Sequence, residues 1–542
     1  MAQVPAADAP PDAGTSEPIA RAAGLVGAAT LTSRILGLVR EQVLAALFGA
    51  GDQMDAFLVA FRIPNLLRDL FAEGAMSAAF VPTFTAHLTK HGKADAWRLG
   101  NNVLNALLLI TGVLALLGTV FARPLVTLYA ENFAAVPGKL ELTVTLARVM
   151  FPFFTLVAIA AAAMGMLNSL RHYFVPALSP ATFNLVAILF AVVLTPVMPM
   201  LGLPPIMSMA VAALVGGLVQ VLVQWPTLRR EGFRYRPILD LRDRGLRQVL
   251  VLMGPGTVGL AATQVNLLVS TLLATSQGTG AVSWLQYAFR VMYLPLGLFG
   301  VSIATAVLPA AARHAALGDR AAIRRTVSQG LTLMLVVNIP ATCGLIALST
   351  EIIRLLLERG HFTAADTTAT AAALRLYAVG LVGYSTIRIT SPVFYALGRS
   401  RVPVALSAVS TLTNLGLSLV LVRVMGFGGL ALATSLAALV SATLGVVLLR
   451  NHLDGLAGRS LALTFLKTGV ASAAMTLAVV GVNRSLSGTT GDAGAAMQAL
   501  HLIAAIAAGL LALALSARAL RLAEFMSLAA EARRRVQKLL AH

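Results

Sequence analysis

Long apolar stretches recur along the whole chain, each bounded by a short polar or basic segment. About 20 consecutive apolar residues are enough for a helix to cross the hydrocarbon core of a bilayer. The pattern therefore predicts an all-α, multi-pass membrane protein with fourteen spans. The spans are expected near residues 23–47, 57–85, 101–122, 140–167, 177–197, 205–226, 248–275, 283–312, 326–349, 369–397, 402–422, 427–449, 462–483 and 497–517.

The composition agrees with this pattern. Hydrophobic residues make up 58% of the 542 residues and charged residues 12%, whereas a soluble domain carries about 25% charged residues. The single cysteine, Cys343, excludes an internal disulfide and argues against a cysteine-based metal or iron–sulfur site. Basic loops that set the orientation in the membrane explain most of the net charge of +19, so we infer no nucleic-acid binding from it.

The basic residues are distributed unequally between the two sides of the predicted spans. With the N-terminus inside, the inner segments hold 26 of the 41 lysines and arginines, and the outer loops hold six. This bias predicts that both termini are cytoplasmic. The C-terminal tail carries Arg533, Arg534, Arg535 and Lys538, and we expect it to lie on the inner leaflet as an amphipathic helix.

Three short motifs recur after nearly the same interval, which indicates an internal duplication. Phe61-Arg62 recurs as Phe289-Arg290, Val81-Pro82 as Leu308-Pro309, and Asn184-Leu185 as Asn414-Leu415, at offsets of 228, 227 and 230 residues. Each copy holds six spans, so the copies share one orientation and predict two parallel lobes with the substrate site between them. We expect a disordered cytoplasmic tail (1–20), a first lobe (21–228), a basic cytoplasmic loop (229–247), a second lobe (248–450), two further helices (451–517) and a basic cytoplasmic tail (518–542).

Several arginines lie within the apolar spans themselves, where each costs about 2.5–3.5 kcal/mol on insertion. They include Arg34, Arg40, Arg62 and Arg68 in the first two spans, and Arg290 in a later one. Such residues normally face a cavity or a partner, so they predict a cationic cavity. A cationic cavity suits an anionic substrate, and the planar fork of arginine matches phosphate.

Acidic residues accompany these arginines. Glu41 follows Arg40 directly, so the two either form an ion pair that merely permits insertion or belong to a polar face that lines the cavity. Asp69 and Glu73 are four residues apart and would repel each other if both were ionised, so we expect them to pair with arginines. Asp55, at the outer mouth of the second span, is either a solvated loop acid or a gating residue.

Signatures of enzymes are absent or out of context. The glycine pattern at residues 254–259 matches GxGxxG, but it opens an apolar span without a βαβ unit, which favours a bent transmembrane helix over a dinucleotide site. The chain has no Walker A motif, no His/Glu metal cluster and no Ser-His-Asp arrangement. These features favour a transporter over an enzyme.

The first two spans carry a specific family resemblance. Residues 32–41 read TSRILGLVRE, residues 64–68 read PNLLR, and residues 79–82 read AFVP. The segment 24–84 closely resembles the bacterial lipid II flippases of the MurJ (MviN) family, in the multidrug/oligosaccharidyl-lipid/polysaccharide exporter superfamily. The resemblance implies a protein of the bacterial inner membrane that moves lipid II, the undecaprenyl-pyrophosphate-linked disaccharide pentapeptide, from the inner to the outer leaflet by alternating access. The last two helices would form a groove for the lipid tail.

The resemblance also implies roles for single residues. The substrate-binding positions fall on Ser33, Arg34, Arg40 and Arg290, and further important charges fall on Asp55, Arg68 and Glu73; the residue pattern adds Arg62 and Glu41. Some relatives carry acids where this chain has Phe289 and Tyr293, and a sodium-binding Asp where it has Ser418. We therefore expect no cofactor and no strong sodium site, the alternative being a weak site near Asn414 and Thr434.

Other functions share parts of this pattern. A flippase for another undecaprenyl-pyrophosphate-linked oligosaccharide would need the same cationic cavity. A multidrug or cation antiporter of the superfamily would need carboxylates in its cavity instead of arginines, and a structural scaffold needs no buried arginines. Lipid II and membrane lipids are the expected partners, with the cell-wall synthesis machinery as a candidate protein partner.

Overall fold

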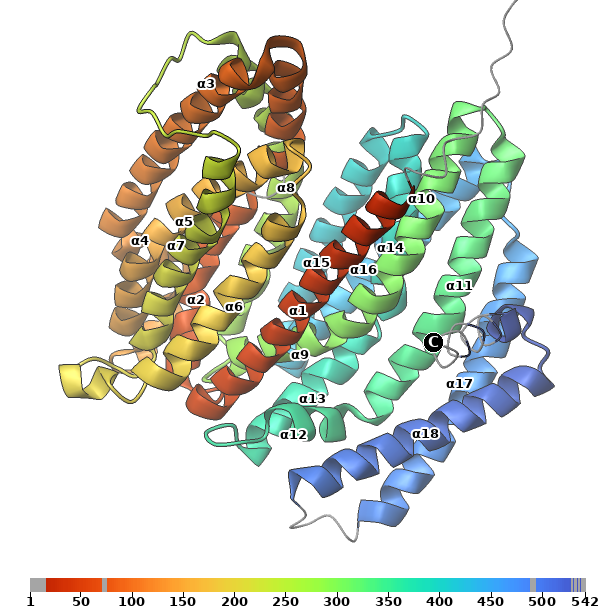
Figure 1. Cartoon of the computed structure of the whole chain (residues 1–542). Helices are drawn as coiled ribbons and strands as arrows, with labels where there is room; N and C mark the ends of the chain where they lie inside the picture. The colour runs from red at the N-terminus through yellow and green to blue at the C-terminus, as the bar shows by residue number, and fades with distance from the viewer. Residues whose placement is uncertain are drawn as a thin grey trace, which may run out of the picture. The chain divides into compact units, whose positions relative to one another are not determined.

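The computed structural model describes residues 16–70, 76–487 and 494–527, with residues 530, 534 and 537; the side chains of residues 16–23, 77–78, 254–263, 265 and 487 are not described. Every regular element in these residues is a helix (Figure 1), which confirms the all-α class. The glycine pattern at residues 254–259 lies within α8 (Arg244–Thr275), so its backbone is helical and no dinucleotide-binding strand–turn–helix is formed there.

The chain forms two compact units. Unit 1 consists of Met1–Leu44 and Val59–Ala261, and unit 2 of Ala45–Leu58 and Ala262–His542. Consequently α1 (Ser16–Phe48), α2 (Asp52–Arg68) and α8 each contribute residues to both units. The lobe boundaries inferred from the duplication stay a prediction.

Unit 1 is organised around one central helix. Its further helices are α3 (Met76–Val120), α4 (Ala122–Ala130), α5 (Lys139–Ser169), α6 (Phe174–Leu194) and α7 (Met207–Arg230). α5 packs against both α3 and α7, and its apolar window is 67% buried, the largest share among the candidate spans. Gly92 takes a left-handed φ of 82° and divides α3 into two helical halves. Phe80, Phe84 and Leu99 fill the core beside this bend.

Unit 2 contains the longer series of helices. They are α9 (Ala281–Pro295), α10 (Val301–Ala316), α11 (Arg320–Ala347), α12 (Ser349–Leu357), α13 (Ala364–Ala378), α14 (Leu381–Ala396), α15 (Arg401–Met425), α16 (Phe427–His452), α17 (Gly458–Ser487) and α18 (Ala495–Ala519). Met334, Ile389 and Phe394 form a core between α10, α11 and α14. A second core joins α11, α17 and α18, and α18 lies along α17 (Figure 1).

Ten helical segments in the described residues are long and apolar enough to cross a membrane, which makes the chain a multi-pass membrane protein. The windows in α15 and α18 are only 17% buried, and large apolar side chains such as Leu412, Val424 and Leu511 are exposed there. Exposed apolar surface of this extent suits lipid contact rather than water. The count of fourteen spans stays a prediction.

The structure differs from the sequence interpretation at the ends and in two connections. α1 begins at Ser16, so residues 16–20 of the expected N-terminal tail are helical, while residues 1–15 lie outside the described residues. The helices α4 and α12 were not expected as separate elements. In the C-terminal tail residues 523–527 are helical, and most of the basic run after them lies outside the described residues.

Candidate functional site

Arg40 on α1 is the centre of a polar cluster in unit 1. Its Nη2 atom lies 2.5 Å from Oε1 of Glu41, and its Nη1 atom donates to Oδ1 of Asn184 on α6 at 3.0 Å. Asn184 in turn donates from Nδ2 to the backbone carbonyl of Ser33 at 3.1 Å. The ion pair between Arg40 and Glu41, which the sequence left as one of two alternatives, is therefore formed.

The cluster does not use all the hydrogen-bonding capacity of Arg40. The side chains of Arg40 and Glu41 are only 15% and 8% exposed. The Nε atom of Arg40 is buried and donates to no acceptor among the described residues. Buried N–H donors are nearly always hydrogen-bonded in folded proteins. A hydrogen bond from this nitrogen to an acceptor atom of a bound ligand would therefore be favourable.

The other charged residues of the first two helices are arranged differently. Arg34 is exposed on α1, and Ser33 is half-buried beside it. Arg62 on α2 is half-buried and forms no hydrogen bond or ion pair within the described part of the chain. Arg68 pairs with Asp69, whose Oδ1 lies 2.8 Å from Nη2 and 3.1 Å from Nε of the arginine. The prediction that Asp69 pairs with an arginine is confirmed.

Glu73, which was expected to pair in the same way, lies outside the described residues. Pro64 is buried inside α2, and the helix continues through it to Arg68. A proline inside a helix removes one backbone hydrogen bond and favours a bend at that point.

Asp55 caps a helix from another part of the sequence. It is fully buried in unit 2, and its Oδ2 atom accepts from the backbone N–H of Gly280 at 2.7 Å. Its Oδ1 atom accepts from the backbone N–H and the hydroxyl of Ser283, at 3.0 and 2.7 Å. Gly280 is the N-cap of α9, has a left-handed φ of 91° and offers no side chain of its own for capping. The solvated alternative for Asp55 is therefore wrong, and its gating role stays a prediction.

A carboxylate is well suited to this position. The N-terminus of a helix carries about half a positive charge and unpaired N–H groups, both of which stabilise an anion. Around this cap, Thr279 donates to Asp52 at 2.7 Å, and the indole of Trp284 donates to Asp366 at 2.9 Å. The start of α2, the start of α9 and the start of α13 are thus joined by polar contacts.

Arg290 follows this cap on α9 and is exposed. Near it, Phe289 packs edge-on against Tyr377 with ring centroids 5.4 Å apart, and it also contacts Tyr293. Arg388 donates to the hydroxyl of Tyr293, and its guanidinium lies 5.5 Å from the centre of that ring. Aromatic rings and an arginine therefore surround Phe289 and Tyr293.

The candidate sodium residues provide neutral oxygens. Asn414 donates from Nδ2 to Asn266 at 2.7 Å and to Ser270 at 3.2 Å. Its Oδ1 atom and the hydroxyl of Ser418 are buried and have no hydrogen-bond partner among the described residues. Thr434 donates to a carbonyl of its own helix. These oxygens are neutral and do not compensate the charge of a cation, and the expectation that the chain has no strong sodium site stays a prediction.

No group of three or more His, Cys, Asp or Glu side chains that would hold a metal ion is found within the described ranges. Among the predicted residues, Asn184 joins Ser33 to Arg40, Arg40 pairs directly with Glu41, and Arg68 pairs with Asp69. Asp55 and Arg290 belong to unit 2.

The sequence interpretation did not assign roles to Asn184, Gly280 or Ser283. The available signal for Asn184 was an amide in an apolar span, because a buried amide needs partners. The signal for Gly280 and Ser283 was a glycine followed by a serine at the start of a predicted helix.

The chain consists of many membrane-spanning helices in two units, and several of these helices carry buried ionisable side chains. This is the architecture of a secondary transporter. The solved structures agree. The chain resembles an inward-facing multidrug resistance MATE family transporter of the MOP superfamily with a TM-score of 0.65 and 16% identity, over 78% of this chain and 94% of that one. It resembles a structure described as lipid II flippase MurJ in an inward closed conformation with a TM-score of 0.75 and 27% identity, over 92% and 99%.

Comparisons of sequence define the family. The family model described as lipid II flippase MurJ matches residues 44–517. The probable lipid II flippase MurJ of Bdellovibrio bacteriovorus is 35% identical over 469 residues, which cover 85% of this chain and 88% of that protein. The lipid II flippase MurJ of Burkholderia cenocepacia is 34% identical over 437 residues, covering 80% and 84%. The chain belongs to the lipid II flippase MurJ family.

Proposed function

We propose that this chain carries lipid II from the inner to the outer leaflet of the bacterial cytoplasmic membrane by alternating access, and so supplies peptidoglycan synthesis. Its membership of the lipid II flippase MurJ family, through a match that spans residues 44–517, carries this proposal. A flippase moves its substrate without changing a covalent bond, so the chain is a transporter and not an enzyme.

The pyrophosphate of lipid II is bound by arginines. Arg34 and Arg40 of α1 and Arg290 of α9 supply the guanidinium groups, and Ser33 supplies a small polar contact. The unpartnered Nε of Arg40, beside an ion pair that already fixes the same side chain, supports this role. A guanidinium that is held in place loses less conformational entropy when it binds phosphate.

The remaining charges support the transport cycle. Asp55 holds the start of α9 and gates the outer side, and Arg62, Arg68 and Glu73 act as gating or structural charges. Glu41 orients Arg40. The distribution of lysine and arginine supports an orientation with both termini in the cytoplasm. Lipid II is the substrate, and the cell-wall synthesis machinery is a candidate partner.

Depletion of the protein in its host tests the substrate. We expect lipid II to accumulate in the inner leaflet, as measured by mass spectrometry of extracted lipid-linked precursors. Accumulation of a different undecaprenyl-pyrophosphate-linked oligosaccharide, with lipid II unchanged, would assign the chain to that substrate and contradict the proposal.

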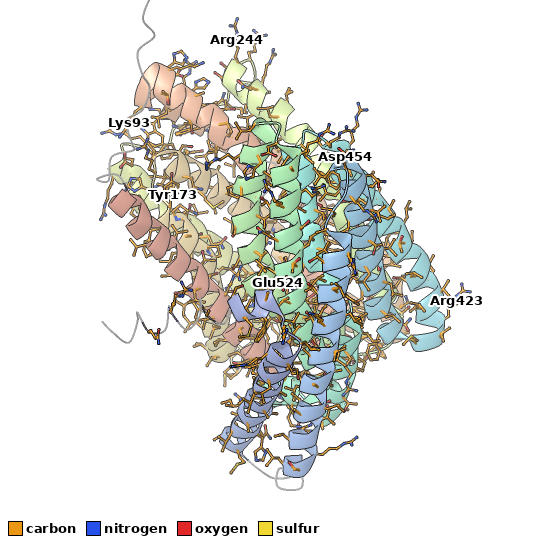
Figure 2. The ribbon with its side chains drawn as sticks, turned by 90° about the vertical axis from the view of Figure 1, so that its right-hand side faces the viewer. Lys93, Tyr173, Arg244, Arg423, Asp454 and Glu524 are labelled. Atoms are coloured by element: carbon orange, nitrogen blue, oxygen red, sulfur yellow. The ribbon has the colours of Figure 1, made fainter. Side chains whose placement is uncertain are left out.

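Substitution of the arginines tests the binding site. Arg34→Ala, Arg40→Ala and Arg290→Ala should each abolish complementation of a flippase-depleted cell, because each removes a bidentate donor for phosphate. The lysine variants should restore growth only partly, since lysine lacks the planar fork. Arg423→Ala is the matched control, because Arg423 is exposed at the end of α15 (Figure 2) and should complement fully. Normal growth of all three alanine variants would refute the assigned site.

A double variant separates binding from structure at Arg40. Arg40→Ala removes the ion pair between Arg40 and the buried Glu41, and that alone costs stability. In Arg40→Ala/Glu41→Ala both charges are gone, so no unpaired charge stays buried. If the ion pair were merely structural, the double variant would therefore function. We expect the double variant to reach the membrane at the wild-type level and still fail to complement. Restored growth would mean that Arg40 serves only to neutralise Glu41.

A further inference from the structure

A cavity of about 690 Å³ lies within unit 2, where α11 and α17 begin and where the segment after α18 packs against them. This volume is typical of a small-molecule site. Its walls include Arg324, Arg325, Ser460 and Glu524. Figure 2 shows Glu524 on the short helical segment that follows α18. No residue discussed above as part of the transport site lines this cavity.

The two arginines in the wall have no hydrogen-bond or ion-pair partner among the residues that the structure describes. Arg324 and Arg325 are exposed on the first turns of α11, and neither forms a hydrogen bond or an ion pair with any residue that the structure describes. Two acids near the start of α11 are already engaged: Asp454 pairs with Arg320 at 3.3 Å, and Asp319 caps α11 by accepting from the N–H of Ala322. Two adjacent guanidinium groups therefore face the cavity uncompensated.

Glu524 presents the opposite charge to the same cavity. It is half-buried, and among the described residues its carboxylate forms no ion pair, with Arg324 or Arg325 included. Because these opposite charges line one cavity but do not form an ion pair with each other, a ligand can bind between them. A ligand with one negative and one positive group satisfies both sides at once, whereas a simple anion would be repelled by Glu524.

Neutral groups at the arginine side favour an oxyanion there. Ser328 accepts a hydrogen bond from the N–H of Ala457 at 3.3 Å, which fixes the segment before α17 against α11. Ser460 lies in the first turn of α17, a helix of 30 residues, and lines the cavity. A hydroxyl and a helix N-terminus beside two guanidinium groups provide the donors that a phosphate group needs.

The lining changes from charged to apolar along α11. Arg324, Ser328 and Thr332 follow one another at intervals of four residues and form one stripe of the wall, about 12 Å long at 1.5 Å per residue. Leu333 lines the inner end of this stripe, and Leu456 faces the cavity from the segment before α17. α11 and α17 are both candidate membrane spans. The cavity thus combines a polar end with an apolar one, as an amphiphilic ligand requires.

We propose that this cavity binds the headgroup of a zwitterionic phospholipid with a free ammonium group, a phosphoethanolamine headgroup. Arg324 and Arg325 bind the phosphate, Glu524 binds the ammonium group, and Leu333 contacts the start of the acyl chains. The proposal is independent of which lipid the protein transports. It assigns a structural or regulatory lipid to the junction of α11, α17 and the C-terminal segment.

Native mass spectrometry of the purified full-length chain tests this proposal. Phosphatidylethanolamine, phosphatidylglycerol and phosphatidylcholine with identical acyl chains are added in turn, and bound lipid is counted. We expect phosphatidylethanolamine to bind best. Arg324→Gln/Arg325→Gln should weaken its binding about tenfold, as loss of a charge-assisted hydrogen-bonding partner does. Arg320→Gln is the matched control, because Arg320 lies on the same helix, outside the cavity, and should leave binding unchanged.

Glu524→Gln tests the ammonium contact. It should remove the preference for phosphatidylethanolamine over phosphatidylglycerol while both lipids still bind. Equal binding of the two lipids by the wild type, or an unchanged preference in Glu524→Gln, would overturn the zwitterion assignment. Unchanged binding by the double arginine variant would overturn the site itself. Soluble glycerophosphoethanolamine is the second arm: if it raises the melting temperature as much as the lipid at equal concentration, the ligand is a soluble phosphoethanolamine and the lipid assignment is wrong.

Discussion

At the scale of single residues, the largely buried side chains of Arg40, Glu41 and Asp55 are held by hydrogen bonds rather than left to face lipid. Arg40 is bound by Glu41 and by Asn184, and Asp55 is bound by three donors at the start of α9. Burying an unpaired charge costs several kcal/mol, so such partners are a condition for placing charges inside a membrane protein.

The cap formed by Asp55 yields a prediction about stability. Asp55→Asn removes the negative charge and puts an N–H2 group against an N–H donor, so it should lower the stability of the purified protein by about 2 kcal/mol, the range for hydrogen bonds to charged groups. The measurement is the thermal midpoint in detergent, together with complementation. We expect the midpoint to fall and transport to decline.

Two milder variants rank the contributions of the bonds around this cap to thermal stability. Ser283→Ala removes one of the three donors to Asp55 and should have a smaller effect than Asp55→Asn. Asp52→Asn alters the bond from Thr279, whose side chain is exposed to solvent, and should have the smallest effect. If Asp55→Asn and Asp52→Asn lowered the midpoint equally, the buried cap would not be a special source of stability.

The sequence predicted the charged residues of the site better than their partners. Arginines and acids inside apolar spans are conspicuous, because hydropathy excludes them there. Asn184 and Ser283 are not conspicuous, since small polar residues are common in membrane helices and their partners are more than a hundred residues away. The alternatives for Asp55 were open for the same reason: burial depends on helix packing, which local pattern does not specify.

At the scale of elements, asparagines on α3 hold the segment that follows α7. Asn101 donates to the carbonyl of Arg234 and accepts from the N–H of Arg236, and Asn102 makes the same pair of bonds with Asp240. Each side-chain amide thus uses both its N–H and its carbonyl oxygen to bind the backbone of this segment. The basic loop, expected only as a charged connection, is fixed along α3.

Protease sensitivity tests this arrangement. Asn101→Ala/Asn102→Ala removes four hydrogen bonds to the loop, each contributing about 1 kcal/mol, so local opening of the loop should become far more frequent. We expect trypsin to cleave after Arg234 at least about tenfold faster than in the wild type, whereas the bond after Arg236 precedes Pro237 and resists trypsin. The measurement is the rate of fragment formation by mass spectrometry.

Tyr235→Phe is the matched control, because it removes one bond, to Asn105, and should accelerate cleavage only slightly. Equal cleavage rates in the wild type and the double alanine variant would show that the asparagines do not secure the loop.

A cluster of charged side chains links α3 to the segments that follow α5 and α7. Glu231 accepts from Lys93 at 2.9 Å and contacts His172 at 2.9 Å. The hydrogen bond from Lys93, and then that from His172, holds the pKa of Glu231 below its usual value. A lowered pKa in the folded state means that this contribution to stability is present at neutral pH and is lost as the pH falls through the lowered value. The contribution is small, because both partners of Glu231 are largely exposed.

The helices themselves were largely predictable, and their junctions were not. Apolar length and periodicity are local properties, so all expected spans fall on helical residues wherever the structure describes them, apart from short turns. The short helices α4 and α12 adjoin long spans, and nothing in hydropathy separates them from the helix before. Their ends depend on turns and tertiary contacts, which sequence pattern encodes weakly.

At the scale of the whole molecule, hydrogen bonds between distant loops bear on the topology. His361 donates from its N–H to the carbonyl of Ala46 at 2.9 Å, so the end of the first expected span and the connection after the ninth lie at one end of unit 2. Arg320 pairs with Asp454, which joins the connections after the eighth and twelfth spans. Each pair unites loops expected on the same side of the membrane, so the alternation of the spans is consistent within unit 2.

Cysteine labelling tests which loops face the cytoplasm and which face the periplasm. The chain has one cysteine, so Cys343→Ala provides a background for single new cysteines. An impermeant maleimide applied to intact cells with a permeabilised outer membrane should label Arg423→Cys at the predicted outer side. It should label Lys90→Cys and Asp454→Cys only after the inner membrane is disrupted. The reverse pattern would invert the proposed orientation.

The energy source is also a property of the whole molecule. Lipid II carries a pyrophosphate anion, and outward movement of each negative charge is favoured by about 2.3 kcal/mol per 100 mV of inside-negative potential. Sodium coupling would instead need a site that compensates a cation. Asn414 and Ser418 each have a buried oxygen without a hydrogen-bond partner in the part of the chain that the structure describes, but both oxygens are neutral. A neutral site of this kind stabilises a buried cation poorly.

We therefore predict that transport depends on membrane potential and little on sodium. Flipping is measured in cells with sodium replaced by choline at fixed potential, and then with the potential collapsed at fixed sodium. The first change should have little effect and the second a large one; the opposite result would show sodium coupling. Ser418→Asp is the matched variant, because it adds the carboxylate that the neutral pair lacks. In that variant we expect the rate of flipping to become sodium-dependent, since the unpaired buried carboxylate then needs a cation to neutralise it.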